Sequence, residues 1–172
     1  MLVTLLAKEG SGGGGATASG AGGLRPAEFR LHGAVRLRDL GVEVRVPSSW
    51  SATRRHSAIT LRSGDRTTAL AISAESPAGR QSKILESELA GIRHGYEAVS
   101  VATGFGKEIG GLPARGAVVS ARTRSGTPLR ILLATGSGDR HTYLVEVFSA
   151  TNAPPERLIQ AQLALGTLKL GR

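Results

Sequence analysis

The chain contains no cysteine, few aromatic residues and no long apolar run. Without cysteine, disulfides, thiolate zinc sites and thiol nucleophiles are all excluded. Because only six of 172 residues are aromatic, the core must be built mainly from aliphatic side chains. A membrane-spanning helix needs about 20 apolar residues, and the chain as given has no such segment. The length suffices for one domain of ordinary size with its own core, plus a tail.

Positive charge is what the chain has in excess. The formal net charge is +9, and arginine supplies most of it, since lysine occurs only at positions 8, 83, 107 and 169. A basic protein attracts acidic partners and surfaces. The charge therefore indicates either a dedicated site for a polyanion or a generally basic soluble domain, and we favour the second interpretation.

The N-terminal part of the chain has the composition of a tether. Segment 1–8 is apolar but too short to cross a bilayer, and a signal peptide would also need a basic start. It is either the end of an anchor that begins upstream of Met1, which we favour, or a short tip. Stretch 9–30 is glycine-rich and predicts a flexible linker. A phosphate-binding loop would need a strand before it and a helix after it, and neither flank fits. We expect a single α+β domain over 31–172.

Alternating apolar and polar residues predict β-strands in the folded part. In "AVRLRD", Val35 and Leu37 share one face of a strand, while Arg36 and Arg38 share the other. The turns between the predicted strands are short, which favours an antiparallel sheet. Further strands are expected in "GVEVRVP", in the two halves of "SAITLRSGDRTTALAISAE" around a Ser63-Gly64-Asp65 turn, and in "ARGAVVSART", "PLRILLATG" and "HTYLVEVFSA".

Two segments have helical rather than strand periodicity. The first has Ser82 as its candidate N-cap and the second begins at Pro154 and ends at Gly166. A turn-rich break at 104–113 follows the first helix. The sequence thus predicts an α+β fold, with an antiparallel sheet of about six to seven strands flanked by two main helices. The apolar residues that should face the sheet are Leu85, Leu89, Ile92 and Tyr96 in the first helix, and Leu158, Ile159, Leu163 and Leu165 in the second.

The side chains that catalysis usually needs show no productive spacing. The four histidines are isolated, and no Gly-x-Ser-x-Gly motif occurs. Glu86 and Glu88 lie two residues apart on a predicted helix and so do not share a face. Asp65 and Asp139 lie in turn sequences, where aspartate stabilises the turn itself. "GFGKEIG" lacks the spacing of a phosphate loop. We therefore expect no catalytic residue, no metal, no cofactor and no enzymatic activity.

The remaining candidates are binding residues. Arg54, Arg55 and His56 form a basic run after Trp50, the only tryptophan. Arg122 and Arg124 are expected to project from one face of a strand, because alternation puts residues two apart on the same side. Two interpretations remain open for each group. Trp50 is either a fold anchor, which we favour, or part of a ligand site. The arginines form either a basic surface for carboxylates or phosphates, or a solvated sheet face, which we favour. Nucleic acid is not favoured, because the basic strands lack aromatic platforms. The candidate binding residues are Trp50, Arg54, Arg55, His56, Arg122 and Arg124.

Three motifs in order carry a family resemblance. They are "VPSSW", "GLPARGAVVSARTRSG" and "DRHTYLVEVFSATNAPPERLIQAQLALGTLKL", and together they span roughly Leu31 to Leu170. With these motifs the chain resembles the Mog/PsbP-like superfamily, and within it the actinobacterial envelope proteins of LpqN type. The resemblance implies an antiparallel sheet flanked by helices, Trp50 packed at a sheet edge, and non-enzymatic accessory, chaperone or binding work. One departure is the missing cysteine, which lipid-anchored members carry at the mature N-terminus.

Three functions are consistent with these observations. The first, which we favour, is a non-catalytic binding or accessory domain, tethered at the extracytoplasmic face of the cell envelope and facing a protein partner or an acidic membrane surface. The second is a soluble intracellular adaptor or chaperone that binds a protein partner in the cytoplasm. The third is a basic module for polyanions, whose binding would fall steeply with salt.

Overall fold

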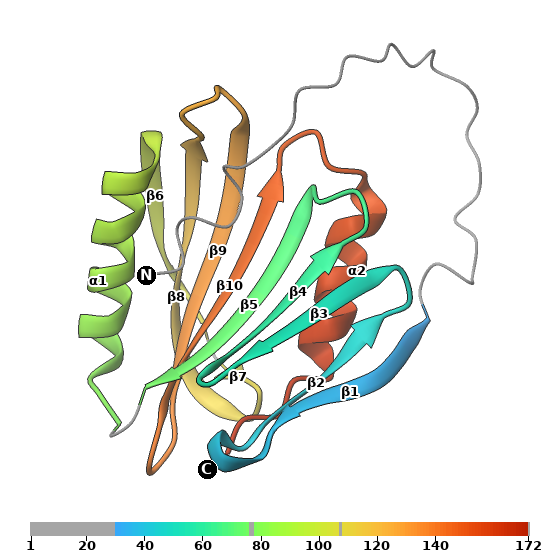
Figure 1. Cartoon of the computed structure of the whole chain (residues 1–172). Coiled ribbons are helices and arrows are strands. Elements are labelled where there is room, and N and C mark those ends of the chain that lie inside the picture. Colours follow the sequence, from blue (N-terminus) through green and yellow to red (C-terminus); the bar gives the residue numbers. More distant parts are fainter. Residues whose placement is uncertain (1–29, 76–77, 107, 172) are drawn as a thin grey trace.

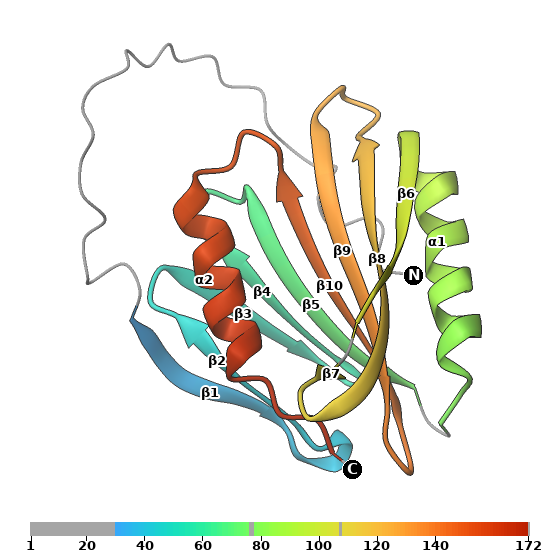
Figure 2. The same cartoon turned by 180° about the vertical axis from the view of Figure 1, so that it is seen from behind.

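The computed structural model describes residues 30–75, 78–106 and 108–171. The apolar segment and the glycine-rich stretch up to residue 29 lie outside these residues. The described part forms three layers, with a curled antiparallel sheet between two helices (Figure 1). Seen from behind, α2 lies across the sheet while α1 stands at its other end (Figure 2). The elements are β1 Leu31–Leu37, the 3-10 turn η2 Arg38–Leu40, β2 Val42–Pro47, β3 Trp50–Arg55, β4 Ala58–Ser63, β5 Thr68–Glu75, α1 Gln81–Gly95, β6 Glu97–Phe105, β7 Glu108–Ile109, β8 Leu112–Arg122, β9 Pro128–Ser137, β10 Thr142–Ala150 and α2 Pro155–Gly166.

The main sheet has eight strands in the order β3-β4-β5-β10-β9-β8-β6, with β7 paired to β8. Every pairing between strands of the described residues is antiparallel, and β1 and β2 form a separate two-stranded sheet. The predicted α+β class is therefore confirmed. The main sheet is larger than predicted because β3 and most of β6 were not assigned as strands, and β7 lies in the segment 104–113 that was predicted to be a turn-rich break. After Trp50, all of β3 is exposed, so it lacks the apolar alternation that marks a half-buried strand.

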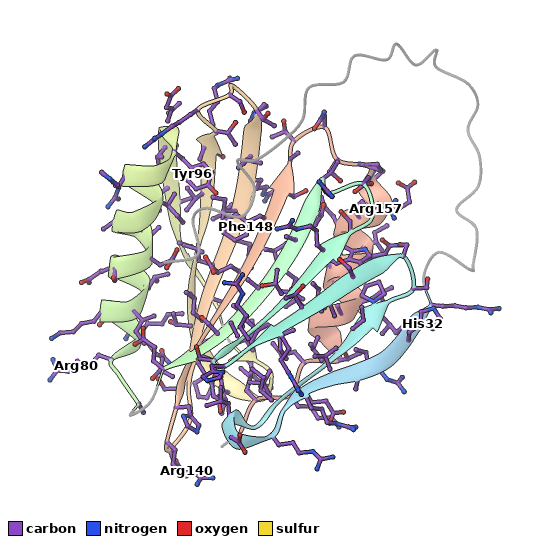
Figure 3. All side chains as sticks on the ribbon, viewed as in Figure 1. His32, Arg80, Tyr96, Arg140, Phe148 and Arg157 are labelled. Carbon is purple, nitrogen blue, oxygen red and sulfur yellow. The ribbon has the colours of Figure 1, made fainter. Side chains whose placement is uncertain are left out.

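Strand β10 lies in the middle of the sheet and is covered on both faces. Every residue from Thr142 to Ser149 is buried, which explains its nearly continuous apolar sequence. Tyr143, Val145 and Val147 belong to the core under α2. Phe148 points to the opposite face and belongs to the core under α1. Figure 3 labels Phe148 and Tyr96, which join that second core.

Helix α1 packs on the sheet as its periodicity predicted, but its start differs. Residue Arg80 is the N-cap and makes no side-chain capping bond, so the prediction of a Ser82 cap is wrong. The side-chain amide of Gln81 instead donates from Nε2 to the carbonyl of Pro113 at 2.9 Å, which joins the first turn to β8. The inward residues are Ile84, Leu89 and Ile92.

Helix α2 buries a different face from the one predicted. Its buried residues are Gln160, Ala161 and Ala164, whereas Leu158 is 39% and Leu163 is 38% exposed. The two small alanines let the helix approach the sheet closely. Periodicity could not reveal this face, because a buried glutamine interrupts the apolar pattern.

The C-terminal segment holds the β1–β2 sheet in place. Lys169 and Glu43 exchange two backbone hydrogen bonds of 2.9 and 3.0 Å. The Tyr143 hydroxyl donates to the carbonyl of Leu40 at 2.8 Å. Gly41 has a φ of +64°, and a side chain there would meet the backbone of Gly171 at 2.8 Å, so the turn requires glycine. These contacts fix the turn that borders the candidate site.

Candidate binding groove

Trp50 is part of the core. Its side chain is 7% exposed, and the residue begins edge strand β3. The indole nitrogen donates to Oε1 of Gln160 in α2 at 2.7 Å. Buried tryptophan usually finds a partner for its N–H, and here the partner lies on the helix that covers the sheet. The geometry therefore gives Trp50 a structural role as an anchor between β3 and α2.

A polar network extends from this anchor to the β4–β5 turn. Arg157 donates to Gln160 Oε1 at 3.0 Å and to Oδ2 of Asp65 at 2.6 Å. Figure 3 places Arg157 at the start of α2, beside that turn. The other carboxylate oxygen of Asp65 accepts bonds from the Ser63 hydroxyl and from the amide and hydroxyl of Thr67. Burial alone would raise the pKa of Asp65, but these hydrogen bonds hold the pKa well below its usual range.

We expect Asp65→Asn to lower the free energy of unfolding by about 1–2 kcal/mol at pH 7, because charge-assisted bonds become neutral ones. Since the folded-state pKa is depressed, this stability is present above the unfolded-state pKa and is lost as the pH falls below it. The difference from wild type should therefore shrink below about pH 4. Urea unfolding at pH 7 and pH 3 measures this difference in the free energy of unfolding, and the exposed variant Asp139→Asn is the control. An equal loss at both pH values would contradict the role of the charge.

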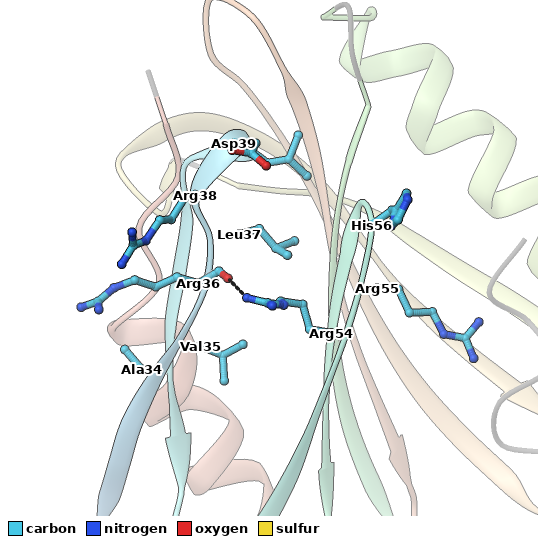
Figure 4. A pocket seen from close by; sticks show the side chains of 10 residues that line it. Ala34, Val35, Arg36, Leu37, Arg38, Asp39, Arg54, Arg55 and His56 are labelled. Carbon is cyan, nitrogen blue, oxygen red and sulfur yellow. Dashed lines mark hydrogen bonds between the residues drawn. The ribbon is translucent and has the colours of Figure 1, made fainter.

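The basic residues meet in a groove between β1 and the end of β3. The groove has a volume of about 850 Å³ and is open to solvent. Figure 4 shows the Arg54 side chain extended across it, with Nη1 donating to the carbonyl of Arg36 at 3.3 Å. Arg55 points away from Arg54 in the same view, as alternation along a strand requires. The lining residues are Ala34, Val35, Arg36, Leu37, Arg38, Asp39, Leu40, Arg54, Arg55 and His56.

The groove carries a surplus of positive charge. Four arginines and one aspartate line it. Arg36 is paired with Glu43 at 2.7 Å, and this hydrogen bond raises the pKa of Arg36 and lowers that of Glu43. Arg54 bonds to a neutral carbonyl rather than to a carboxylate. Between these charges, Val35, Leu37 and other aliphatic side chains give the groove an apolar part. The arrangement suits a carboxylate-bearing ligand that also has an apolar surface.

Arg122 and Arg124 do not join this groove. Four strands stand between β3 and β8 in the sheet. Arg122 donates to the carbonyl of Gly126 at 2.6 Å and so braces the β8–β9 turn. Arg124 lies in that turn rather than on the strand, so the expectation that both project from one strand face is wrong for it. The structure therefore brings together Arg54, Arg55 and His56, but not the second arginine pair.

The other wall of the groove was only partly visible in the sequence. The alternation had marked Arg36 and Arg38 as outward residues, and their side chains do extend away from Arg54 in Figure 4, but nothing local placed their strand beside Arg54. Asp39 and Leu40 lie in the 3-10 turn η2, which the strand pattern did not predict. Their positions depend on the contacts of β2 with the C-terminal segment, which the strand pattern alone does not specify.

Within the described residues, the structure also bears on metal binding and on membrane crossing. In that part of the chain, no three His, Asp or Glu side chains gather in a way that could hold a metal. Neither of the two helices in it is long and apolar enough to span a membrane.

Comparison by sequence finds no matching family model and no matching curated protein. Comparison by structure finds similar folds at low identity. Cyanobacterial PsbP (CyanoP) from Synechocystis sp. PCC 6803 matches with a TM-score of 0.60 and 9% identity, over 89% of this chain and 98% of that one. The Ran-binding protein Mog1p of Saccharomyces cerevisiae matches with a TM-score of 0.54 and 7% identity, over 83% and 96%.

LpqN of Mycobacterium tuberculosis, described as involved in cell envelope biogenesis, matches with a TM-score of 0.55 and 14% identity, over 81% of this chain and 90% of that one. A Bacteroides thetaiotaomicron structure matches with a TM-score of 0.50, and the chain spans 45% of its length. Because these matches to PsbP, Mog1p and LpqN extend over more than four fifths of the chain, the chain has the Mog/PsbP-like fold.

Proposed function

We propose that this chain is a non-catalytic binding domain that holds an acidic segment of a protein partner in the groove between β1 and β3. The observation that carries the proposal is the groove itself, which combines four arginines with an apolar part and an open shape. A small charged metabolite would need a more enclosed site with convergent polar groups. A protein segment can use both the charges and the apolar surface.

The comparisons support a binding role at the coarse level. One similar fold belongs to a Ran-binding protein, and another belongs to a protein involved in cell envelope biogenesis. The apolar segment and glycine-rich stretch that precede the domain have the composition of a tether. We therefore place the domain at the extracytoplasmic face of the envelope, as an accessory protein held near the membrane.

Removing charge from the groove should weaken partner binding. We expect the double variant Arg54→Gln/Arg55→Gln to lose about tenfold to a hundredfold in affinity, because two charge-assisted bonds are lost. Both arginines are exposed, so folding should be little affected. Quantitative affinity capture from a host envelope extract, at low and at physiological salt, makes the measurement.

The matched control removes the same charge elsewhere. Arg122→Gln/Arg124→Gln gives the same net charge but leaves the groove intact, and it should retain the same proteins as the wild type. Equal retention by both double variants would show that net charge or another surface selects the partners, and the groove proposal would fail.

The proposed location has its own test. Host cells are fractionated with an antibody against the domain, and the membrane pellet is washed with alkaline carbonate. Retention in the washed pellet is expected for a tethered domain. Release into the cytosol would contradict the envelope location and would favour an intracellular adaptor that uses the same groove.

A further inference from the structure

The outer edge of β3 faces the groove and has no strand partner in the described part of the chain. The sheet order places β3 at one end and β6 at the other. An edge strand presents a row of unpaired amide and carbonyl groups that another extended chain can use. The two edges of this sheet differ in how readily another strand could pair with them.

Edge strand β6 is irregular. Its register with β8 shifts between Glu97 and Ser100 and again between Thr103 and Phe105. Ala98 has a φ of +49°, which is unusual for a residue with a side chain. Bulges of this kind twist an edge and protect it from further pairing. By contrast, β3 pairs with β4 from Trp50 to Arg55 with no shift in register.

The register also tells which groups of β3 point outward. The Gly64 amide donates to the carbonyl of Ser49 at 3.1 Å. Since antiparallel pairs alternate between bonded and non-bonded residues, the amides and carbonyls of Ala52 and Arg54 point away from β4. Arg54 lines the basic groove, and Ala52 lies two residues before it on the same edge of β3. Arg54 spans the groove to β1, so the two backbones lie farther apart there than the ~4.8 Å of paired strands.

We infer that the groove binds an extended acidic segment of a partner protein that adds as a strand to the edge of β3. This inference rests on the proposed function and specifies its ligand. Backbone bonds to Ala52 and Arg54 would supply register, and Arg54 and Arg55 would receive carboxylates. Because Arg54 and Arg55 lie on opposite faces of β3, two consecutive acidic residues can place one carboxylate on each face. A free phosphate group would use the charges but not the strand edge.

The test uses a defined probe, the acetylated and amidated peptide Thr-Val-Glu-Glu-Val-Thr, with its Gln-Gln counterpart as the charge control. On binding, the amide signals of Ala52 and Arg54 should shift in 1H–15N spectra and should exchange more slowly with solvent. Ala52→Pro removes one outward amide without removing a bond to β4, since proline is tolerated at such edge positions. We expect this variant to bind the peptide at least tenfold more weakly while its spectrum shows an intact fold.

A second measurement makes the same test from the peptide side, so that the result does not depend on Ala52→Pro folding. Methylating the two central amide nitrogens of the peptide removes backbone donors and should weaken binding to the wild type by a similar factor.

If Ala52→Pro and the methylated peptide both bind at full strength while Arg54→Gln weakens binding, strand addition is overturned and the basic groove stands. If Arg54→Gln also binds at full strength, the proposed function falls as well. If inorganic tripolyphosphate binds the groove as tightly as the peptide and displaces it, the groove is a polyanion site and the inference is overturned.

Discussion

Glu146→Gln should raise the free energy of unfolding at pH 8 by up to about 5 kcal/mol and should flatten its dependence on pH. Glu146 is 2% exposed in the middle of β10, and its Oε1 has no hydrogen-bond partner among the described residues. Burial, together with the charge and hydrogen bond of Glu88 on α1, raises the pKa of its carboxyl to about 8. Tyr96, whose pKa is raised first by burial and then by these two carboxylates, faces the pair.

The direction of this pH dependence follows from the number of protons that the folded and unfolded states bind. In the folded chain Glu146 stays protonated up to about pH 8, whereas in the unfolded chain it ionises near 4.5. The folded state therefore binds more protons between these values, so the contribution of Glu146 to stability is fully present below about pH 4.5 and is lost as the pH rises towards 8. Glutamine has the shape of the protonated acid and does not ionise, so the variant avoids the cost of keeping a carboxyl protonated above its unfolded-state pKa.

Chemical denaturation of the wild type and variant between pH 5 and pH 9 makes the measurement. Glu88→Gln should shift the steep part of the wild-type profile to lower pH, because it removes a like charge but leaves Glu146 buried. Glu86→Gln, exposed on the same helix, should leave the profile unchanged. A wild-type profile that is flat from pH 5 to pH 8 would show that Glu146 ionises freely in the folded protein.

The parts of the fold that the sequence predicted are those with strong local patterns. The β4–β5 hairpin, strands β8 to β10 and both helices each have periodicity or turn residues of their own. Strand β3 was missed because it is exposed after Trp50 and is held by backbone bonds to β4, which leave no mark on side-chain polarity. The prediction of the buried face of α2 was wrong because that face includes the polar residue Gln160. Its partner there is Trp50, which lies 110 residues away in the chain.

Only half of the candidate site could be predicted from the sequence. Arg54, Arg55 and His56 stood out as a basic run, and the alternation marked Arg36 and Arg38 as outward residues. That β1 lies opposite Arg54, so that the Arg36 carbonyl accepts a bond from it, depends on how the β1–β2 sheet is held by Lys169 and by the Tyr143 hydroxyl. The side chains of Arg36 and Arg38 themselves extend to the other side of β1 (Figure 4). Contacts between segments this far apart in the chain are set by packing. For the same reason the sequence could not tell that Arg122 lies beyond reach of the groove.

Trp50→Ala should lower the free energy of unfolding by about 3–5 kcal/mol, the range for removing a large buried aromatic side chain. Loss of the ring would leave a cavity between β3 and α2 and would remove a donor from Gln160. Trp50→Phe keeps most of the apolar contact, and Arg157 still donates to Gln160, so this variant should lose only about 1–2 kcal/mol. Thermal and urea unfolding compare the two.

The phenylalanine variant also separates the two roles that the sequence left open for Trp50. Because it should remain folded, its affinity for the acidic peptide reports on the ligand site rather than on stability. Trp50 is 7% exposed and bonded to α2, whereas the groove is lined by β1, η2 and the far end of β3. Unchanged affinity, together with the loss of stability, is therefore expected of an anchor. A large loss of affinity in a folded Trp50→Phe variant would instead make the indole part of the binding surface, and the groove would have to extend along β3 to reach it.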